Sequence, residues 1–158
     1  VAIEPGDSAS TLQDKLAAVG ARLVVEAMRR AAAGGLTRTP QPDEGVTYAQ
    51  KIAKSEGAVD WSAPAATVER RLRAFDPFPG ATSRLGVESL KLWRGRVVDG
   101  RGAPGQILGA DDAGIVVACG EGALQIAELQ RSGGRRMGVA QFLAAHPIAP
   151  GLRFQGPG

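Results

Sequence analysis

A chain of 158 residues, of which 44% are hydrophobic and 22% charged, has the composition of a globular domain with room for an appendage. No apolar run approaches the roughly 20 residues that a membrane-spanning helix needs, which argues against a membrane protein. The only cysteine, Cys119, rules out an intramolecular disulfide and favours a reducing compartment. The start at Val1 lacks the features of a signal peptide and reads as the middle of a longer chain. We therefore expect a cytoplasmic protein that has been processed or truncated.

The basic residues are concentrated after residue 45. Residues 1–45 contain five Lys or Arg and six Asp or Glu, whereas residues 46–158 contain fourteen and ten. The second part therefore carries a net charge of +4 within an overall +3. Such a surface can attract a polyanion, although many other domains share this bias.

Residues 1–36 contain the first expected element, an amphipathic helix that ends at Gly34-Gly35. Its apolar residues recur at three- and four-residue spacing behind capping-type residues. No other segment of residues 1–45 offers this apolar stripe a partner, so the helix resembles the last helix of another domain. The stripe consists of Leu12, Leu16, Val19, Leu23 and Ala27, and the capping-type residues are Asp7, Ser8 and Ser10.

Residues 37–47 form the predicted linker, because Pro40 and Pro42 remove backbone donors and favour extended conformations. In the polar segment 48–57 that follows, Lys51 and Lys54 would share a face only on a helical turn.

A second helix is predicted within residues 60–80, where Val68, Leu72 and Phe75 form an apolar stripe. Ser62 is its expected N-cap, with Pro64 in the first turn, and it ends where Asp76 precedes Pro77. Three arginines fall largely off the stripe, where a solvated helix face is the ordinary explanation. They are Arg70, Arg71 and Arg73.

From Ala81 onward the apolar pattern changes to a period of two, with runs interrupted by Gly, Asp and Pro. The runs are TSRL, SLKLWRGRVV, GQILGA, GIVVAC and ALQIAELQ, and a short helix follows near residues 139–145. Five short strands with these helices predict a small barrel of the oligonucleotide-binding (OB) type, although a small sandwich would give a similar pattern.

No catalytic or metal-binding motif accompanies these elements. His146, the only histidine, stands in no motif with a nucleophile or a carboxylate, and one Cys with one His is too few for a zinc site. Neither a P-loop nor a strand-linked GxGxxG occurs. Cys119, at the end of a strand-like run, is expected to be a buried, inert thiol.

Basic and aromatic residues occur together at two places. Lys91, Arg94 and Arg96 surround Trp93, and strand alternation would place Lys91 beside Trp93, with Leu92, Arg94 and Arg96 on the other face. The segment RSGGRRM places Arg131, Arg135 and Arg136 around two glycines. Both clusters suit contact with a phosphate backbone rather than recognition of bases.

Several motifs in chain order resemble the C-terminal half of bacterial methionyl-tRNA formyltransferases, and the resemblance covers the whole chain. These motifs are GVTYAQKIAKSEGAVDW, PAATVERRLRAFDPFPGA, LKLWRGRVV, GAPGQIL, VACGEGALQIAELQRSGGRRM and PGLRF. Phe78 stands where the family commonly has tryptophan, which preserves an aromatic ring.

The resemblance implies a division into a remnant of a Rossmann-like catalytic domain (1–36), a linker (37–47) and an OB-like tRNA-binding domain (48–158). The family's catalytic Asn, His and Asp, which transfer a formyl group from 10-formyltetrahydrofolate to initiator methionyl-tRNA, have no counterpart here. The implied partners are initiator methionyl-tRNA and the chain's own catalytic domain, with no cofactor, metal or membrane for this segment. The implied tRNA contacts are Lys51, Lys54, Arg70, Arg71, Arg73, Lys91, Arg94, Arg135 and Arg136.

Two alternatives remain at this level. The same kind of module is attached to folate-dependent formyltransferases that act on small molecules, and their parent enzyme would not need tRNA. The domain would otherwise be a protein-interaction module whose basic face is merely solvated.

Overall fold

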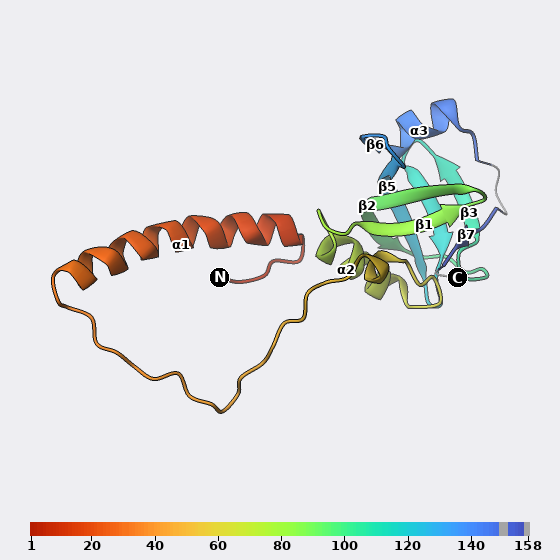
Figure 1. Ribbon diagram of the computed structural model, residues 1–158. Helices are drawn as coiled ribbons and strands as arrows, with labels where there is room; N and C mark the ends of the chain where they lie inside the picture. The colour runs from red at the N-terminus through yellow and green to blue at the C-terminus, as the bar shows by residue number, and fades with distance from the viewer. Residues whose placement is uncertain (149–151, 157–158) are drawn as a thin grey trace. The chain divides into compact units, whose positions relative to one another are not determined.

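The computed structural model describes residues 1–148 and 152–156 (Figure 1). The chain separates into two compact units, Val1–Ile52 and Ala53–Gly158. Each unit is described by itself below.

The first unit consists of one long helix, α1 (Ala9–Ala32), and the extended segment that follows it. Ser8 caps the helix, since its hydroxyl accepts a hydrogen bond from the Thr11 backbone N–H at 3.3 Å. The neighbouring Asp7 carboxylate accepts hydrogen bonds from Lys15 Nζ (2.7 Å) and from the Glu4 backbone N–H (2.8 Å). These bonds lower the pKa of Asp7 to about 2, with Lys15 as the largest cause.

The apolar stripe of α1 is not covered within the described residues. None of the residues of α1 is buried, and Leu16, Leu23 and Met28 are each at least half exposed. This agrees with the expectation that the helix lacks a partner for its apolar face.

The second unit is built on a single curled, antiparallel sheet. Within the described residues the strand order is β3-β4-β5-β2-β1-β7, with β6 paired to β5. The strands are β1 (Ala81–Leu85), β2 (Glu88–Val98), β3 (Ile107–Asp111), β4 (Gly114–Ala118), β5 (Ala123–Arg131), β6 (Arg136–Gly138) and β7 (Phe154–Gln155).

The segment that contains β7 joins the two ends of this sheet. β7 pairs with β1, and the same segment hydrogen-bonds to the chain just before β3. The Ile107 N–H donates to the Leu152 carbonyl and the Phe154 N–H donates to the Gly105 carbonyl, both at 2.7 Å. The sheet therefore closes into an OB-like barrel, as the sequence predicted, rather than opening into two packed sheets.

Gly105 makes this closure possible. Its φ of +81° favours glycine, and a Cβ atom at this position would lie 2.2 Å from the Phe154 carbonyl oxygen. Any other residue would push the closing segment away from the barrel.

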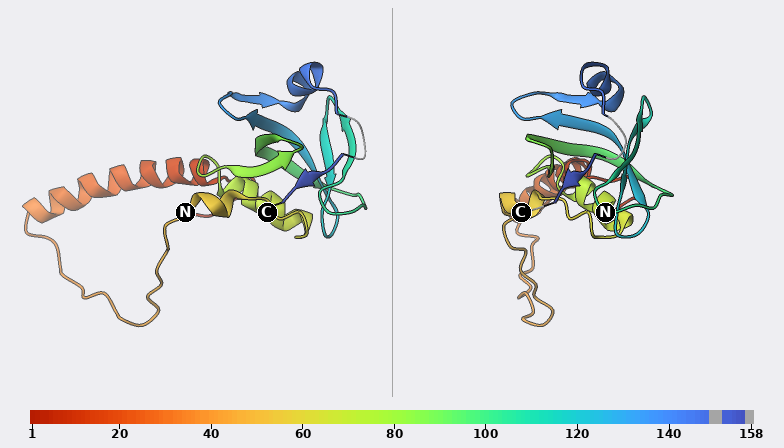
Figure 2. Two further views of the ribbon diagram at one scale, coloured as in Figure 1. Left: turned by 45° about the vertical axis from the view of Figure 1, so that its right-hand side comes forward. Right: turned by 90° about the vertical axis from the view of Figure 1, so that its right-hand side faces the viewer.

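Helices cover the two ends of the barrel (Figure 2). α2 (Ala65–Ala74) buries Val68 and Leu72 in the core, and α3 (Val139–Ala145) at the other end buries Phe142. A short 3-10 helix, η1 (Lys54–Gly57), precedes α2.

The predicted N-cap of α2 is wrong. The helix begins after Pro64, which has no side chain able to cap it. Ser62 instead turns back on Asp60, whose Oδ1 accepts hydrogen bonds from the Ser62 hydroxyl (2.6 Å) and N–H (2.9 Å). These two bonds lower the pKa of Asp60, the hydroxyl contributing most.

The predicted alternation along β2 is also wrong beyond Leu92. Leu92 pairs with Leu129 and Arg94 with Glu128, so Trp93 is an extra residue at a β-bulge. The bulge changes which residues face the core: Leu92 is fully buried there, whereas Arg94 is exposed. Strict alternation had assigned Leu92 and Arg94 to one face.

Candidate nucleic-acid interface

Cys119 and His146 have structural surroundings. Burial raises the pKa of the Cys119 thiol to about 11, so it is protonated at neutral pH, as expected for an inert thiol. The His146 ring stacks on the Phe142 ring, with centroids 4.9 Å apart. Among the described residues there is no group of three or more His, Cys, Asp or Glu side chains that could hold a metal ion. The site residues that the sequence predicted are all basic side chains.

Trp93 is the centre of a basic and aromatic cluster on the outside of the barrel. The Arg136 guanidinium lies over its ring, 3.6 Å from the centroid, and Lys91 Nζ lies 5.5 Å from it. The indole N–H donates to the Gln130 side chain at 3.0 Å. Although it faces outward, the Trp93 side chain is only 5% exposed, because these neighbours cover it.

Both cations of this cluster also bind the loop after α2. Arg136 forms a forked ion pair with Asp76, and Lys91 donates a hydrogen bond to the Pro79 carbonyl at 2.9 Å. The cluster thus ties the chain near residue 76 to a hairpin 60 residues later. Lys91 and Arg136, both predicted tRNA contacts, have structural partners.

The three arginines of α2 differ in their surroundings. Arg73 pairs with Glu69 through two hydrogen bonds of 2.7 and 3.0 Å. Arg71 lies over the Phe75 ring, 5.7 Å from its centroid. Arg70 is exposed and donates only a 3.1 Å hydrogen bond to the Thr67 hydroxyl. Of the three, Arg70 has the charge most available to a ligand.

The remaining predicted contacts are exposed and unpaired. Lys51, Lys54, Arg94 and Arg135 form no ion pair or hydrogen bond through their side chains with any described residue, although Glu128 is the cross-strand partner of Arg94. Lys54 belongs to η1 in the second unit, whereas Lys51 lies in the first unit.

Further exposed cations lie outside the predicted set, among them Arg84 on β1. It is exposed and, like Arg94, has no partner among the described side chains. The exposure of Arg84 follows from the alternation in the segment ATSRL. Ala81 and Ser83 are buried, and Thr82 and Arg84 alternate with them. Arg84 stands alone in this run, without a neighbouring basic or aromatic residue that would mark a cluster.

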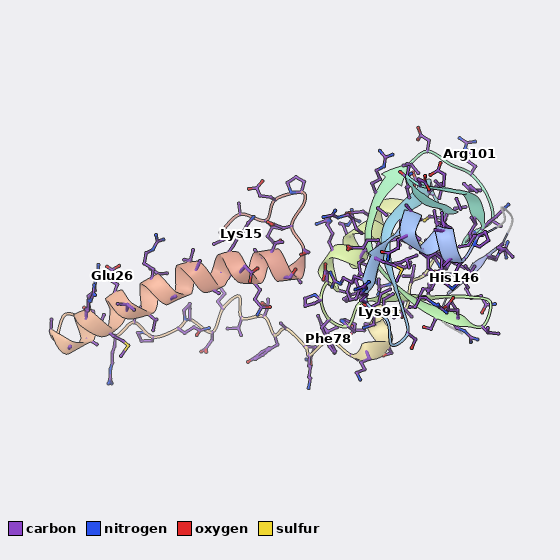
Figure 3. The ribbon with its side chains drawn as sticks, turned by 90° about the horizontal axis from the view of Figure 1, so that it is seen from above. Lys15, Glu26, Phe78, Lys91, Arg101 and His146 are labelled. Carbon is purple, nitrogen blue, oxygen red and sulfur yellow. The ribbon has the colours of Figure 1, made fainter. Side chains whose placement is uncertain are left out.

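Figure 3 shows how some of these side chains are distributed. Lys91 and the exposed Phe78 lie on one side of the barrel, and Arg101, on the connection between β2 and β3, lies on another side. Basic residues are thus present on more than one side of the second unit.

The fold and this surface define an OB-like β-barrel that presents unpaired basic side chains and that is preceded by a helix with an uncovered apolar stripe. Residues 51–147 match the family described as "Formyl transferase, C-terminal domain", and the chain belongs to this family.

Curated relatives are similar to this chain over nearly its whole length. It is 52% identical to a methionyl-tRNA formyltransferase of Paracidovorax citrulli, a match that covers 98% of this chain and 50% of the relative. It is 56% identical to the protein of the same name from Methylibium petroleiphilum over 90% of this chain and 45% of the relative. The chain therefore spans about half the length of the curated relatives that it matches.

Among solved structures, HypX from Aquifex aeolicus in complex with tetrahydrofolic acid is similar, with a TM-score of 0.62 and 25% identity. That match covers 76% of this chain and 22% of HypX. A variant of the same HypX matches with a TM-score of 0.63.

Of the described helices, none is both long and apolar enough to cross a membrane.

Proposed function

We propose that this chain is the tRNA-binding part of a methionyl-tRNA formyltransferase that works in the cytoplasm. In this proposal the formyl donor 10-formyltetrahydrofolate and the catalytic residues belong to a catalytic domain of the same enzyme, and α1 is the last helix of that domain. This chain binds initiator methionyl-tRNA and needs no cofactor of its own.

One observation carries the proposal for tRNA. Several exposed cations of the chain lack an acidic partner, while its curated relatives are named for an enzyme of tRNA. Unpaired cations are the groups that gain most from a phosphate backbone, because no internal ion pair has to be broken first. These cations are Lys51, Lys54, Arg70, Arg94 and Arg135.

The other predicted residues have a different part in the proposal. Arg73, Lys91 and Arg136 position the barrel, α2 and the hairpin between β5 and β6, and Arg71 packs on Phe75. Their removal acts on tRNA binding through the shape of the surface rather than through lost phosphate contacts.

The test is a titration of the chain with uncharged initiator tRNA and with an elongator tRNA at several salt concentrations. The proposal expects binding to both, since phosphate contacts carry no sequence information, with affinity that falls steeply as salt rises. Between about 50 and 200 mM salt, each phosphate contact costs roughly a threefold loss of affinity. Absence of binding at low salt, or binding that salt does not weaken, would refute the proposal.

The similarity to HypX favours a second candidate, a formyltransferase whose substrate is not tRNA. HypX was solved with tetrahydrofolic acid, so a segment of this fold also occurs in a protein that binds a folate. The same titration separates the two candidates, because this second parent predicts no salt-sensitive affinity for tRNA.

A further inference from the structure

An open hollow lies on the outer surface of β1, beside β2 and β7. It has a volume of about 200 Å³, and its lining residues include Thr82, Ser83, Arg84, Ser89 and Gln155. Ala58, directly after η1, also lines the hollow. No acidic residue lines the hollow.

Strand register brings three of these side chains together. Arg84 is the direct cross-strand partner of Ser89, and Thr82 lies two residues from Arg84 on the same face of β1. Cross-strand neighbours of this kind have Cβ atoms roughly 5 Å apart, close enough for their side chains to contact one bound group.

The three side chains have polar groups with nothing to bind within the protein. Neither the Arg84 guanidinium nor the hydroxyls of Thr82 and Ser89 form a hydrogen bond with any described residue. The adjacent Ser83 differs: it accepts a hydrogen bond from Trp61 at 3.0 Å and donates one to the Gln155 carbonyl at 2.9 Å. Ser83 also lines the hollow, but its hydroxyl is used within the protein, whereas the polar groups of Thr82, Arg84 and Ser89 remain available to a ligand.

We propose that this hollow is a subsite for one phosphodiester group of the RNA backbone. The guanidinium supplies a fixed positive charge and a fork of N–H donors, and the two hydroxyls add neutral donors to the same oxygens. This arrangement holds a phosphate without reading a base. The inference rests on the proposed tRNA binding and adds a contact to the predicted set.

The subsite also gives Lys54 a place in the same interface. The chain that carries Lys54 continues through Ala58, which forms a bridge with Thr82 and lies at the edge of the hollow. In this proposal the RNA backbone continues from Arg84 toward the segment that begins with Lys54. One interface then includes residues from η1, β1 and β2.

The experiment compares three variants with the unaltered chain, using initiator tRNA as the probe. Arg84→Gln removes the charge, and Arg101→Gln is a matched control because Arg101 is an exposed arginine that does not line the hollow. The double variant Thr82→Val with Ser89→Ala removes both hydroxyls without changing the charge. Circular dichroism confirms that each variant is folded.

Arg84→Gln is expected to weaken binding roughly three- to tenfold and to reduce the salt slope by about one. The hydroxyl variant is expected to weaken binding by about two- to fourfold with an unchanged slope, since it removes neutral hydrogen bonds. Arg101→Gln is expected to change both quantities much less.

The outcomes separate this proposal from the proposed function. If the unaltered chain does not bind tRNA, the proposed function fails. If it binds with steep salt dependence but Arg84→Gln behaves like Arg101→Gln, the subsite is wrong and the tRNA function stands. If Arg84→Gln alone weakens binding while the hydroxyl variant does not, Arg84 acts only as a general charge and the subsite is overturned.

Discussion

Two adjacent arginines of the chain should respond very differently to the same substitution. Arg136 stacks on Trp93 and pairs with Asp76, whereas Arg135 contacts no described side chain through an ion pair or hydrogen bond. Replacing each by glutamine therefore separates a structural role from a binding role. We expect Arg136→Gln to destabilise the barrel and Arg135→Gln to leave its stability unchanged.

The expected magnitude follows from the two contacts of Arg136. Its cation–π contact with Trp93 is worth about 1 kcal/mol, because the ring is buried but the guanidinium remains partly exposed. The partly exposed ion pair with Asp76 adds up to about 1 kcal/mol. The sum predicts a loss of about 1–2 kcal/mol for Arg136→Gln, against less than about 0.5 kcal/mol for Arg135→Gln.

Urea unfolding followed by tryptophan fluorescence measures these differences. Both tryptophans, Trp61 and Trp93, are buried in the second unit, so the signal reports on the barrel. The variant Asp76→Asn isolates the ion pair and is expected to cost less than Arg136→Gln, because it leaves the cation–π contact in place. A double-mutant cycle of the two then gives their coupling.

The effect of Arg135→Gln on tRNA binding completes the test. In the proposed interface, Arg135→Gln lowers the salt slope by about one while the protein remains fully stable. Equal stability of the two variants would refute the structural role of Arg136. A destabilised Arg135→Gln would refute the conclusion that Arg135 is available to a ligand.

Further predictions concern Gly105 and the buried Cys119 thiol of the barrel. Gly105→Ala is expected to destabilise the barrel by about 2–4 kcal/mol in urea unfolding, because a Cβ atom there meets the Phe154 carbonyl at a positive φ. Gly109→Ala is its matched control, since no atom lies within 4 Å of the added Cβ, and equal effects of the two would contradict the closure by β7. The Cys119 thiol, whose pKa is raised to about 11 from 9.0, should resist alkylation at pH 8 in the folded chain and react readily in urea. Because the unfolded thiol ionises first, stability should fall as pH rises from about 9 to about 11 in the native chain but not in a Cys119→Ser variant.

The sequence predicted the local elements because each depends on a short-range pattern. The apolar spacing in residues 12–27 and 68–75 predicted α1 and α2, and the period of two after residue 81 predicted β1 to β5 of the OB-like barrel. The two short strands β6 and β7 were not predicted, because two or three residues are too few to show a period. The uncovered stripe of α1 was visible in the same way, because nothing nearby in the sequence offered it a partner. The resemblance to a formyltransferase family was likewise readable from motifs and agrees with the family match.

Only the tertiary structure determined what each basic side chain contacts. Arg135 and Arg136 are neighbours of the same type, and the difference between them arises from Asp76, which lies 60 residues earlier in the chain than Arg136. The bulge at Trp93 changed the face of Arg94, and the pairing of β1 with β2 placed Arg84 beside Ser89. Such contacts depend on strand register and barrel closure between distant segments, whereas periodicity describes only how a residue relates to its own helix or strand.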